Sequence, residues 1–170
     1  MTNAQKAVYA FLAENGISYR HANHERVSAI SECVLPEKLL CGRMPKNLLL
    51  TPRNESAYYL LIMHPESAFK TGIVSKQAGA SRLSFASDEA LEKLFHTHSG
   101  AVSPFGFLFD KENKVHLLID RKLLSEDRLI FHPLENTASL LLERDKFLDT
   151  VLPLLKRVPT FIDMPELRKE

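Results

Sequence analysis

Apolar residues recur along the first part of the chain at the spacing of an amphipathic helix. Ala4, Val8 and Leu12 lie three to four positions apart, and Gly16 follows as a helix stop. We therefore predict a helix over residues 3–15 that packs its apolar side on the core. Other helices are predicted for part of 66–79, from the cap Ser87 to Phe95, from Ser28 toward Cys33, and from about Asp145 to Lys156 with a kink at Pro153.

The middle of the chain instead carries short apolar runs of strand length. Residues 48–50 and 57–63 are two such runs, and the polar residues 51–56 between them indicate a hairpin connection. Residues 36–45 contain two prolines and a glycine, which is typical of an irregular loop. Further strands are predicted at 82–85, 105–109, 115–120, 128–131 and 137–142.

Helices thus flank a large block of strands, which is the order of an α/β protein of the α+β type. We expect a central mixed, mostly antiparallel β-sheet with helices packed on it. A chain of 170 residues can bury a substantial core, so one domain over residues 1–170 is expected.

Composition narrows the class of protein. The chain is 45% hydrophobic and 25% charged, which argues against disorder, and no apolar run approaches the roughly 20 residues of a membrane span. Its beginning lacks the features of a signal peptide. The two cysteines, Cys33 and Cys41, are too few for a disulfide scaffold. We therefore expect a cytoplasmic monomer with no membrane partner.

Net charge is only +1, so the protein is not a polycation that binds nucleic acid by bulk charge. Residues 1–53 nevertheless carry seven Lys or Arg against four Glu. This excess permits a local basic face without requiring one, and an ordinary solvated surface is the plainer explanation.

Three separate stretches are candidates for chemistry, and each has a plainer explanation. Lys46 precedes an apolar strand and could bind a phosphate or polarise a carbonyl, but such lysines usually extend into solvent. The Gly100–Pro104 loop could offer peptide N–H groups to an ester carbonyl, or could simply be a turn. His132, held extended by Pro133, could contact an amine or ester, or could be a hydrogen-bonded strand residue.

Metal chemistry has weaker support. His96 and His98, like His21 and His24, form close pairs that lack the third or fourth ligand that zinc needs. No GxSxG, HExxH or P-loop motif occurs either, so the common hydrolase and nucleotide-binding motifs are missing.

Taken together and in order, the motifs resemble the YbaK/ProRS-associated editing domain family. The residues that carry the resemblance are Lys46-Asn47 before a strand, Arg82 to Ser87, Gly100 to Pro104 continuing as Phe105-Gly106, and His132-Pro133 with Asn136-Thr137. The resemblance as a whole runs from about Tyr19 to Leu148, which is most of the chain. The branch they resemble most is that of the free-standing deacylases of the PrdX or ProXp-ala type.

This resemblance implies hydrolysis of mischarged proline tRNA, with alanine as the expected amino acid. Lys46 would contact the terminal adenosine or its phosphate, the loop from Gly100 would hold the aminoacyl carbonyl, and His132 would line the aminoacyl pocket. The implied substrate-binding positions are Tyr19, Ser28, Asn47, Ala101, Val102, Ser103 and Pro104. The resemblance implies no metal or organic cofactor. Its partners would be the tRNA acceptor end and prolyl-tRNA synthetase.

Alternatives remain at this level. The chain could remove serine or cysteine instead of alanine, or could be a noncatalytic module that binds tRNA or a synthetase. A metal hydrolase using the histidines is a third. Residues 95–98, Phe-His-Thr-His, depart from the Leu-Gly-Val-Pro typical of the family, and this departure bears on the pocket rim.

Overall fold

The computed structural model describes residues 1–26 and 34–168 of the 170-residue chain. The short helix predicted from Ser28 lies outside the described residues.

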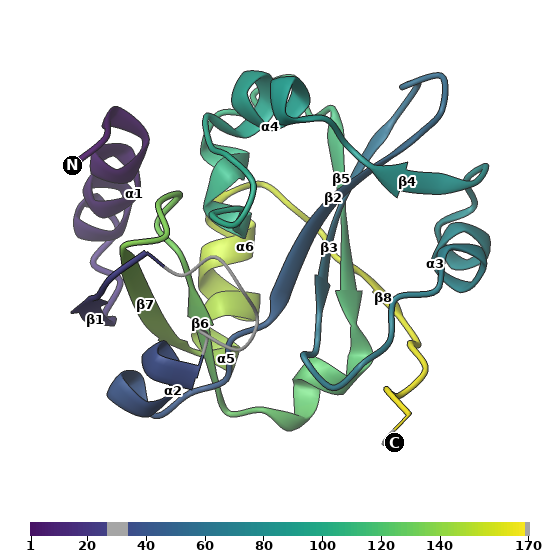
Figure 1. Ribbon diagram of the computed structural model, residues 1–170. Helices are drawn as coiled ribbons and strands as arrows, with labels where there is room; N and C mark the ends of the chain where they lie inside the picture. Colours follow the sequence, from purple (N-terminus) through teal and green to yellow (C-terminus); the bar gives the residue numbers. More distant parts are fainter. Residues whose placement is uncertain (27–33, 169–170) are drawn as a thin grey trace.

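A five-stranded mixed sheet forms one half of the fold (Figure 1). Its strands, in spatial order, are β4 (Leu83–Phe85), β2 (Lys46–Pro52), β3 (Tyr58–Met63), β5 (Val115–Asp120) and β8 (Thr160–Ile162). β2 is antiparallel to β3 and β4, whereas β3–β5 and β5–β8 are parallel pairs. The mixed sheet and the 46–63 hairpin are confirmed.

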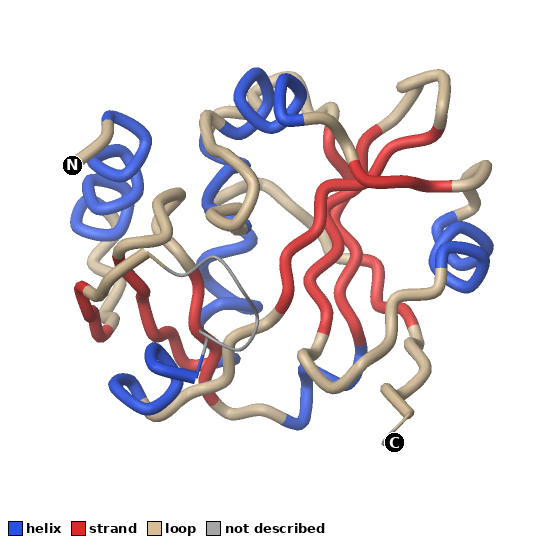
Figure 2. The backbone as a smooth tube through the Cα atoms, viewed as in Figure 1, coloured by secondary structure: helices blue, strands red, loops and turns tan. Residues whose placement is uncertain are grey.

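A second, three-stranded antiparallel sheet stands apart from the first (Figure 2). Its strands are β1 (Arg20–Asn23), β7 (Ala138–Glu143) and β6 (Arg128–Phe131). The predictions near β6 and β7 are confirmed, but β1 was not predicted. Three of its four residues are polar, all except Ala22, and most are exposed, so they show no apolar run. Pairing with β7, rather than local pattern, makes this segment a strand.

Three helices form where the apolar spacing and the caps predict them. α1 (Asn3–Glu14) is capped by Thr2, α4 (Asp88–Phe95) is capped by Ser87, and α3 (Thr71–Ala78) ends at Gly79 with φ of 67°. Both caps accept a hydrogen bond from a backbone N–H of the first turn, which otherwise has no partner in the helix. The helices within the described residues include none long and apolar enough to cross a membrane.

The last helical segment lies between the two sheets (Figure 1). It consists of α5 (Arg144–Lys146), a wide π-helical turn η4 (Phe147–Val151) and α6 (Leu152–Leu154). The wide turn comes just before Pro153, which lacks an N–H and cannot continue a regular α-helix. Phe147, Val151 and Leu152 are fully buried in one core cluster that includes residues of both sheets.

Two local predictions were wrong. Residues 104–108 form a 3-10 helix, η2 (Pro104–Leu108), instead of a strand. Ser103 caps it through the N–H of Phe105, and a run buried on all sides does not distinguish helix from strand by its pattern. Residues 34–40, expected to include an irregular loop, form α2 (Val34–Leu40). Pro36 falls in its first turn, where a helix does not need the missing N–H.

The segment before β2 connects the two sheets. Arg43 pairs with Leu129 of β6 in a parallel bridge, and its carbonyl accepts the N–H of Ile130 at 2.8 Å. Three residues later the chain enters β2. The start of β2 therefore lies beside the end of β6, at the junction of the sheets.

Candidate functional site

A cavity of about 500 Å³ opens at this junction. It is bordered by the start of β2, the end of β6, the first turn of α4 and the loop before η2. Its lining residues include Arg43, Lys46, Asn47, Glu66, Phe85, Leu91, Gly100, Val102 and His132. Three sequence stretches that lie far apart in the chain thus meet around one space.

β2 supplies a cation and an amide to this cavity. Lys46 is its first residue, pairs with Met63 of β3 and is partly buried. No ion-pair partner for Lys46 occurs among the described residues, so its ammonium is available to an anion. Asn47 donates a long hydrogen bond of 3.4 Å to the Pro45 carbonyl, and among the described residues its buried Oδ1 has no partner. An unsatisfied buried oxygen beside a cavity is suited to accept a ligand's N–H or O–H.

The loop before η2 presents backbone to the same cavity. Gly100 has φ of 90°, a conformation that a residue with a side chain rarely adopts. The N–H of Ala101 is already donated to the His98 carbonyl at 3.1 Å. Within the described chain the N–H of Val102 has no acceptor. Of this loop, Gly100 and Val102 line the cavity.

His132 supplies a neutral ring. Its Nδ1 lies 2.8 Å from the Ala138 carbonyl, which can only accept, so Nδ1 carries the proton. Nε2 of the neutral ring then bears a lone pair. Burial lowers the pKa of His132 from its ordinary value of 6.5, and the nearby His24 lowers it further, although the Ala138 hydrogen bond opposes the shift. The ring is therefore an uncharged acceptor at neutral pH.

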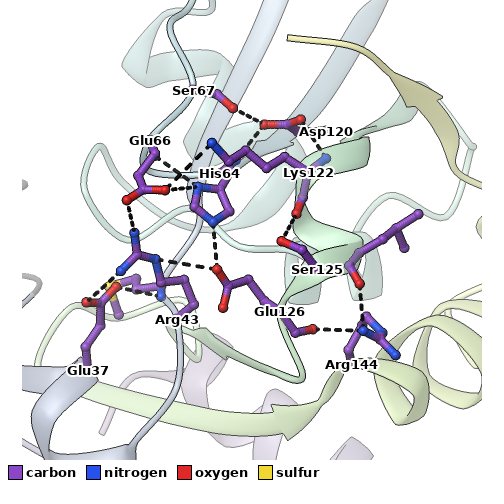
Figure 3. Close-up of polar contacts among 12 residues, drawn as sticks. Glu37, Arg43, His64, Glu66, Ser67, Asp120, Lys122, Ser125, Glu126 and Arg144 are labelled. Carbon is purple, nitrogen blue, oxygen red and sulfur yellow. Dashed lines mark hydrogen bonds and ion pairs between the residues drawn. The ribbon is translucent and has the colours of Figure 1, made fainter. Parts of the chain in front are cut away.

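A network of charged side chains forms the cavity wall on the Arg43 side (Figure 3). Arg43 lies 3.2 Å from Glu66, 4.0 Å from Glu37 and 3.9 Å from Glu126. Figure 3 shows the guanidinium between these carboxylates. Arg43, Glu37 and Glu66 all line the cavity.

Behind this wall, His64 joins the two halves of the fold. Its Nδ1 accepts the N–H of Glu66 at 3.1 Å, so Nε2 carries the proton and donates to Glu126 at 2.8 Å. His64 follows β3 and Glu126 precedes β6, so this bond bridges the sheets (Figure 3). No sequence motif identified this network in advance. The sequence feature that could have indicated the network is the group of charged residues beside the ends of the apolar strands.

The predicted site residues fall into three groups. Lys46, Asn47, Gly100, Val102 and His132 line the cavity. Ala101, Ser103 and Pro104 are buried and do not line it, and Tyr19 is 37% exposed with its ring beside that of Tyr9. Ser28 lies outside the described residues.

The histidines considered for zinc have other neighbours. His96 stacks on Phe109 with ring centroids 4.0 Å apart, and His98 lies 3.4 Å from Glu135. In the described part of the chain no three His, Cys, Asp or Glu side chains are grouped as metal ligands. The Phe-His-Thr-His segment thus packs against η2 and the loop after β6.

The arrangement is suited to a small ester with an anionic neighbour. Lys46 can pair with a phosphate, and an unoccupied N–H at Val102 can donate to a carbonyl oxygen. The His132 lone pair can accept from an ammonium group. Apolar side chains, including Leu91, cover part of the remaining wall.

Comparison with known proteins agrees with this geometry. Residues 24–150 match the aminoacyl-tRNA editing domain family. The prolyl-tRNA editing protein ProX of Acetoanaerobium sticklandii is 31% identical over 140 residues, covering 82% of this chain and 85% of that protein. The prolyl-tRNA synthetase associated domain-containing protein 1 of Bos taurus is 26% identical over 144 residues, covering 82% and 84% of the two chains.

Solved structures share the fold. A crystal structure described as a candidate trans-editing enzyme for prolyl tRNA synthetase superposes with a TM-score of 0.73, covering 98% of this chain and 99% of that chain at 16% identity. At such low identity the likeness concerns the fold alone. With the family match extending over most of the chain and a relative above 30% identity, the protein belongs to the aminoacyl-tRNA editing domain family.

Proposed function

We propose that this protein is a trans-editing deacylase that removes alanine from mischarged proline tRNA. As a member of the editing family it is an aminoacyl-tRNA deacylase. Proline tRNA as the substrate is inferred from the relative named as a prolyl-tRNA editing protein. The identity of the amino acid that is removed, alanine, goes one step further and is part of the proposal.

One observation carries the proposal: Lys46, Gly100 and His132, separated by 86 positions at most, line a single cavity. Each has a plainer explanation when taken alone. A solvent lysine, a turn glycine and a structural histidine have no reason to converge on one space. Their convergence supports a joint role in binding an aminoacyl ester.

The residues that line the cavity would have different roles in binding and hydrolysis. The Lys46 ammonium would hold a phosphate of the tRNA end, and backbone N–H groups near Gly100 and Val102 would polarise the aminoacyl carbonyl. His132 Nε2 would accept from the α-ammonium group. A water molecule, positioned with the help of the neighbouring ribose hydroxyl, would attack the carbonyl carbon. The bond from that carbon to the ribose oxygen would break, a proton from the water would pass to the ribose oxygen, and the free amino acid would be released.

The energetics favour such an enzyme. A synthetase pocket built for proline cannot strongly exclude alanine, because one missing methylene in an apolar pocket is worth only about 1–3 kcal/mol. A second pocket that admits alanine and excludes the proline ring restores fidelity. The ester is already activated, so a positioned nucleophile and carbonyl polarisation suffice without a strong general base.

The whole described chain would act as one editing domain. Both sheets contribute to a single core cluster that contains Leu49 and Ile62 of the large sheet with Phe131 and Leu140 of the small one. Either sheet without the other would leave its side of this core cluster exposed to solvent.

The test is deacylation of a panel of proline tRNAs carrying alanine, serine, cysteine or proline. We expect hydrolysis of Ala-tRNA(Pro) with little loss of Pro-tRNA(Pro). Faster release of serine or cysteine would replace alanine as the substrate. A folded protein that binds the tRNA and hydrolyses none of the four esters would be a noncatalytic binding module, and the proposal would fail.

A further inference from the structure

An exposed aromatic ring stands at the rim of the cavity. Phe85 ends β4 and is 63% exposed, yet it also lines the cavity. Phe95, Phe105, Phe131 and Phe147 are by contrast almost entirely buried. Leaving a phenyl ring this exposed gives up most of the stability that its burial would contribute.

A second ring backs Phe85. The centroid of Phe69 lies 5.4 Å from that of Phe85, with 32° between the ring planes. Phe69 is partly buried and packs against the core cluster beneath β2. The outer ring therefore rests against a partly buried inner ring.

Phe85 also shares a sheet face with Lys46. It pairs with Leu50 of β2, so its side chain lies on the same face as those of Leu50, Leu48 and Lys46. Leu50 and Lys46 are four residues apart, which is about 13 Å along a strand. A ring and a cation thus stand on one side of the sheet along one edge of the cavity.

The chain segment that carries Phe85 is basic, although Glu37, Glu66 and Asp88 also line the cavity. Residues 67–87 contain Lys70, Lys76 and Arg82 and no Asp or Glu. All three cations are exposed, and the described residues provide no ion-pair partner for any of them. An exposed ring whose own chain segment carries unpaired cations suits a single-stranded nucleic acid, because cations can pair with its phosphates and the ring can stack on a base.

We propose that Phe85, supported by Phe69, is the platform on which the 3′-terminal base of the RNA substrate stacks. The proposal rests on the proposed function, because it takes the tRNA acceptor end as the ligand. The terminal ribose carries the aminoacyl ester, so its base must lie beside the cavity that holds the ester. Phe85 is an exposed ring at that place, and Lys46, which lines the same cavity, suits an adjoining phosphate.

A fluorescence experiment tests the stacking without any deacylation. The chain contains no tryptophan, so Phe85→Trp introduces a single reporter at the platform. The matched control is Val158→Trp, because Val158 is 89% exposed and does not line the cavity. The ligands are two RNA hairpins that carry no amino acid. The first is the acceptor stem of proline tRNA with its CCA end. The second is the same hairpin with an abasic site in place of the terminal adenosine.

We expect the intact hairpin to quench Phe85→Trp, the abasic hairpin to quench it much less, and neither to quench Val158→Trp. Equal quenching by both hairpins, or none at Phe85→Trp when the hairpin is bound, would overturn the platform. The abasic hairpin keeps the phosphates, so it separates stacking from charge.

A kinetic experiment measures how much stacking on Phe85 contributes to binding of the substrate. Stacking of one base on an aromatic side chain corresponds to roughly a 5- to 150-fold change in affinity. Phe85→Ala should therefore raise KM for the charged tRNA within that range with little change in kcat, and Phe85→Tyr should restore it. An unchanged KM in Phe85→Ala would contradict the proposal.

The two proposals fail in distinguishable ways. If the terminal base quenches Phe85→Trp but no ester is hydrolysed, the platform stands and the catalytic proposal falls. If the ester is hydrolysed while the quenching and KM tests are negative, the catalytic proposal stands and Phe85 is excluded as the platform.

Discussion

Lys46 meets the cavity at the first position of β2, where the strand emerges from the junction of the sheets. A hydrogen bond to a charged group contributes about 1.5–3 kcal/mol, so Lys46→Ala should lower kcat/KM for Ala-tRNA(Pro) roughly 10- to 150-fold. The side chain has no partner to lose in the described protein, so the free energy of unfolding should hardly change. Steady-state deacylation and urea denaturation measure the two effects.

The control for this substitution is Lys93→Ala. Lys93 lies exposed on α4, outside the cavity lining. Its loss removes the same charge from the protein and should leave kcat/KM nearly unchanged. Equal losses in the two variants would show that Lys46 acts through net charge alone.

His132 carries a pH dependence that can be worked out from its burial. Its pKa in the folded protein lies below the ordinary 6.5, chiefly because burial disfavours the charged ring. Above about pH 6.5 the ring is neutral in both the folded and unfolded chain. As pH falls below 6.5 the unfolded chain binds a proton that the folded chain does not, so folding stability decreases until the folded pKa is reached.

His132→Gln removes this dependence. The variant should lose less free energy of unfolding between pH 7 and pH 5 than the wild type, as followed by urea denaturation at several pH values. His116→Gln, at an exposed histidine beside Tyr59, is the control and should follow the wild-type curve more closely. A His132→Gln curve parallel to the wild type would contradict the depressed pKa.

At the scale of elements, the loop before η2 is positioned by its own backbone. Gly100 has φ of 90°, and a side chain there costs about 1–2 kcal/mol of conformational strain. Gly100→Val should therefore lower stability modestly and, because its side chain would project at the cavity rim, abolish most hydrolysis of Ala-tRNA(Pro). Melting temperature and deacylation are measured together.

Gly16→Val separates strain from obstruction. Gly16 also has a left-handed φ, 62°, and a Cβ there would meet no atom within 4 Å. This variant should lose comparable stability and keep its activity. Full activity in folded Gly100→Val would mean that the loop is a turn with no part in the site.

At the scale of the whole molecule, one buried ion pair ties the end of the last helical segment to the start of β5. Arg157 donates to Asp110 at 2.9 Å, and both side chains are buried. Asp110 also accepts the N–H groups of Lys114 and Val115. Asp110→Ala should lower the free energy of unfolding by about 3–5 kcal/mol, because it leaves a buried guanidinium without its partner.

Arg128→Ala is a suitable comparison, since Arg128 forms an exposed pair with Glu143 at 3.5 Å. Exposed pairs contribute about 0–1 kcal/mol, so its urea midpoint should stay near that of the wild type. Equal shifts in the two variants would refute the structural role of the Asp110 pair.

Sequence alone determined the features that depend on neighbouring residues. Apolar spacing and the Ser87 cap predicted α1 and α4, because a helix is stabilised by contacts three to four positions apart. Apolar runs around a polar turn predicted the β2–β3 hairpin. The ordered motifs also predicted the editing family, and with it Lys46 and His132 as cavity residues.

Only the tertiary structure decided what depends on distant partners. β1 is a strand because β7 pairs with it, and residues 104–108 form a 3-10 helix although their apolar run permits a strand. The cavity wall at Arg43 arises because residues before β2 pair with β6. No sequence pattern near Arg43 predicts that pairing. The physical reason is the same in each case. The spacing of apolar residues indicates which side of a helix or strand is apolar, whereas the segment that packs against this side is determined by contacts between distant parts of the chain.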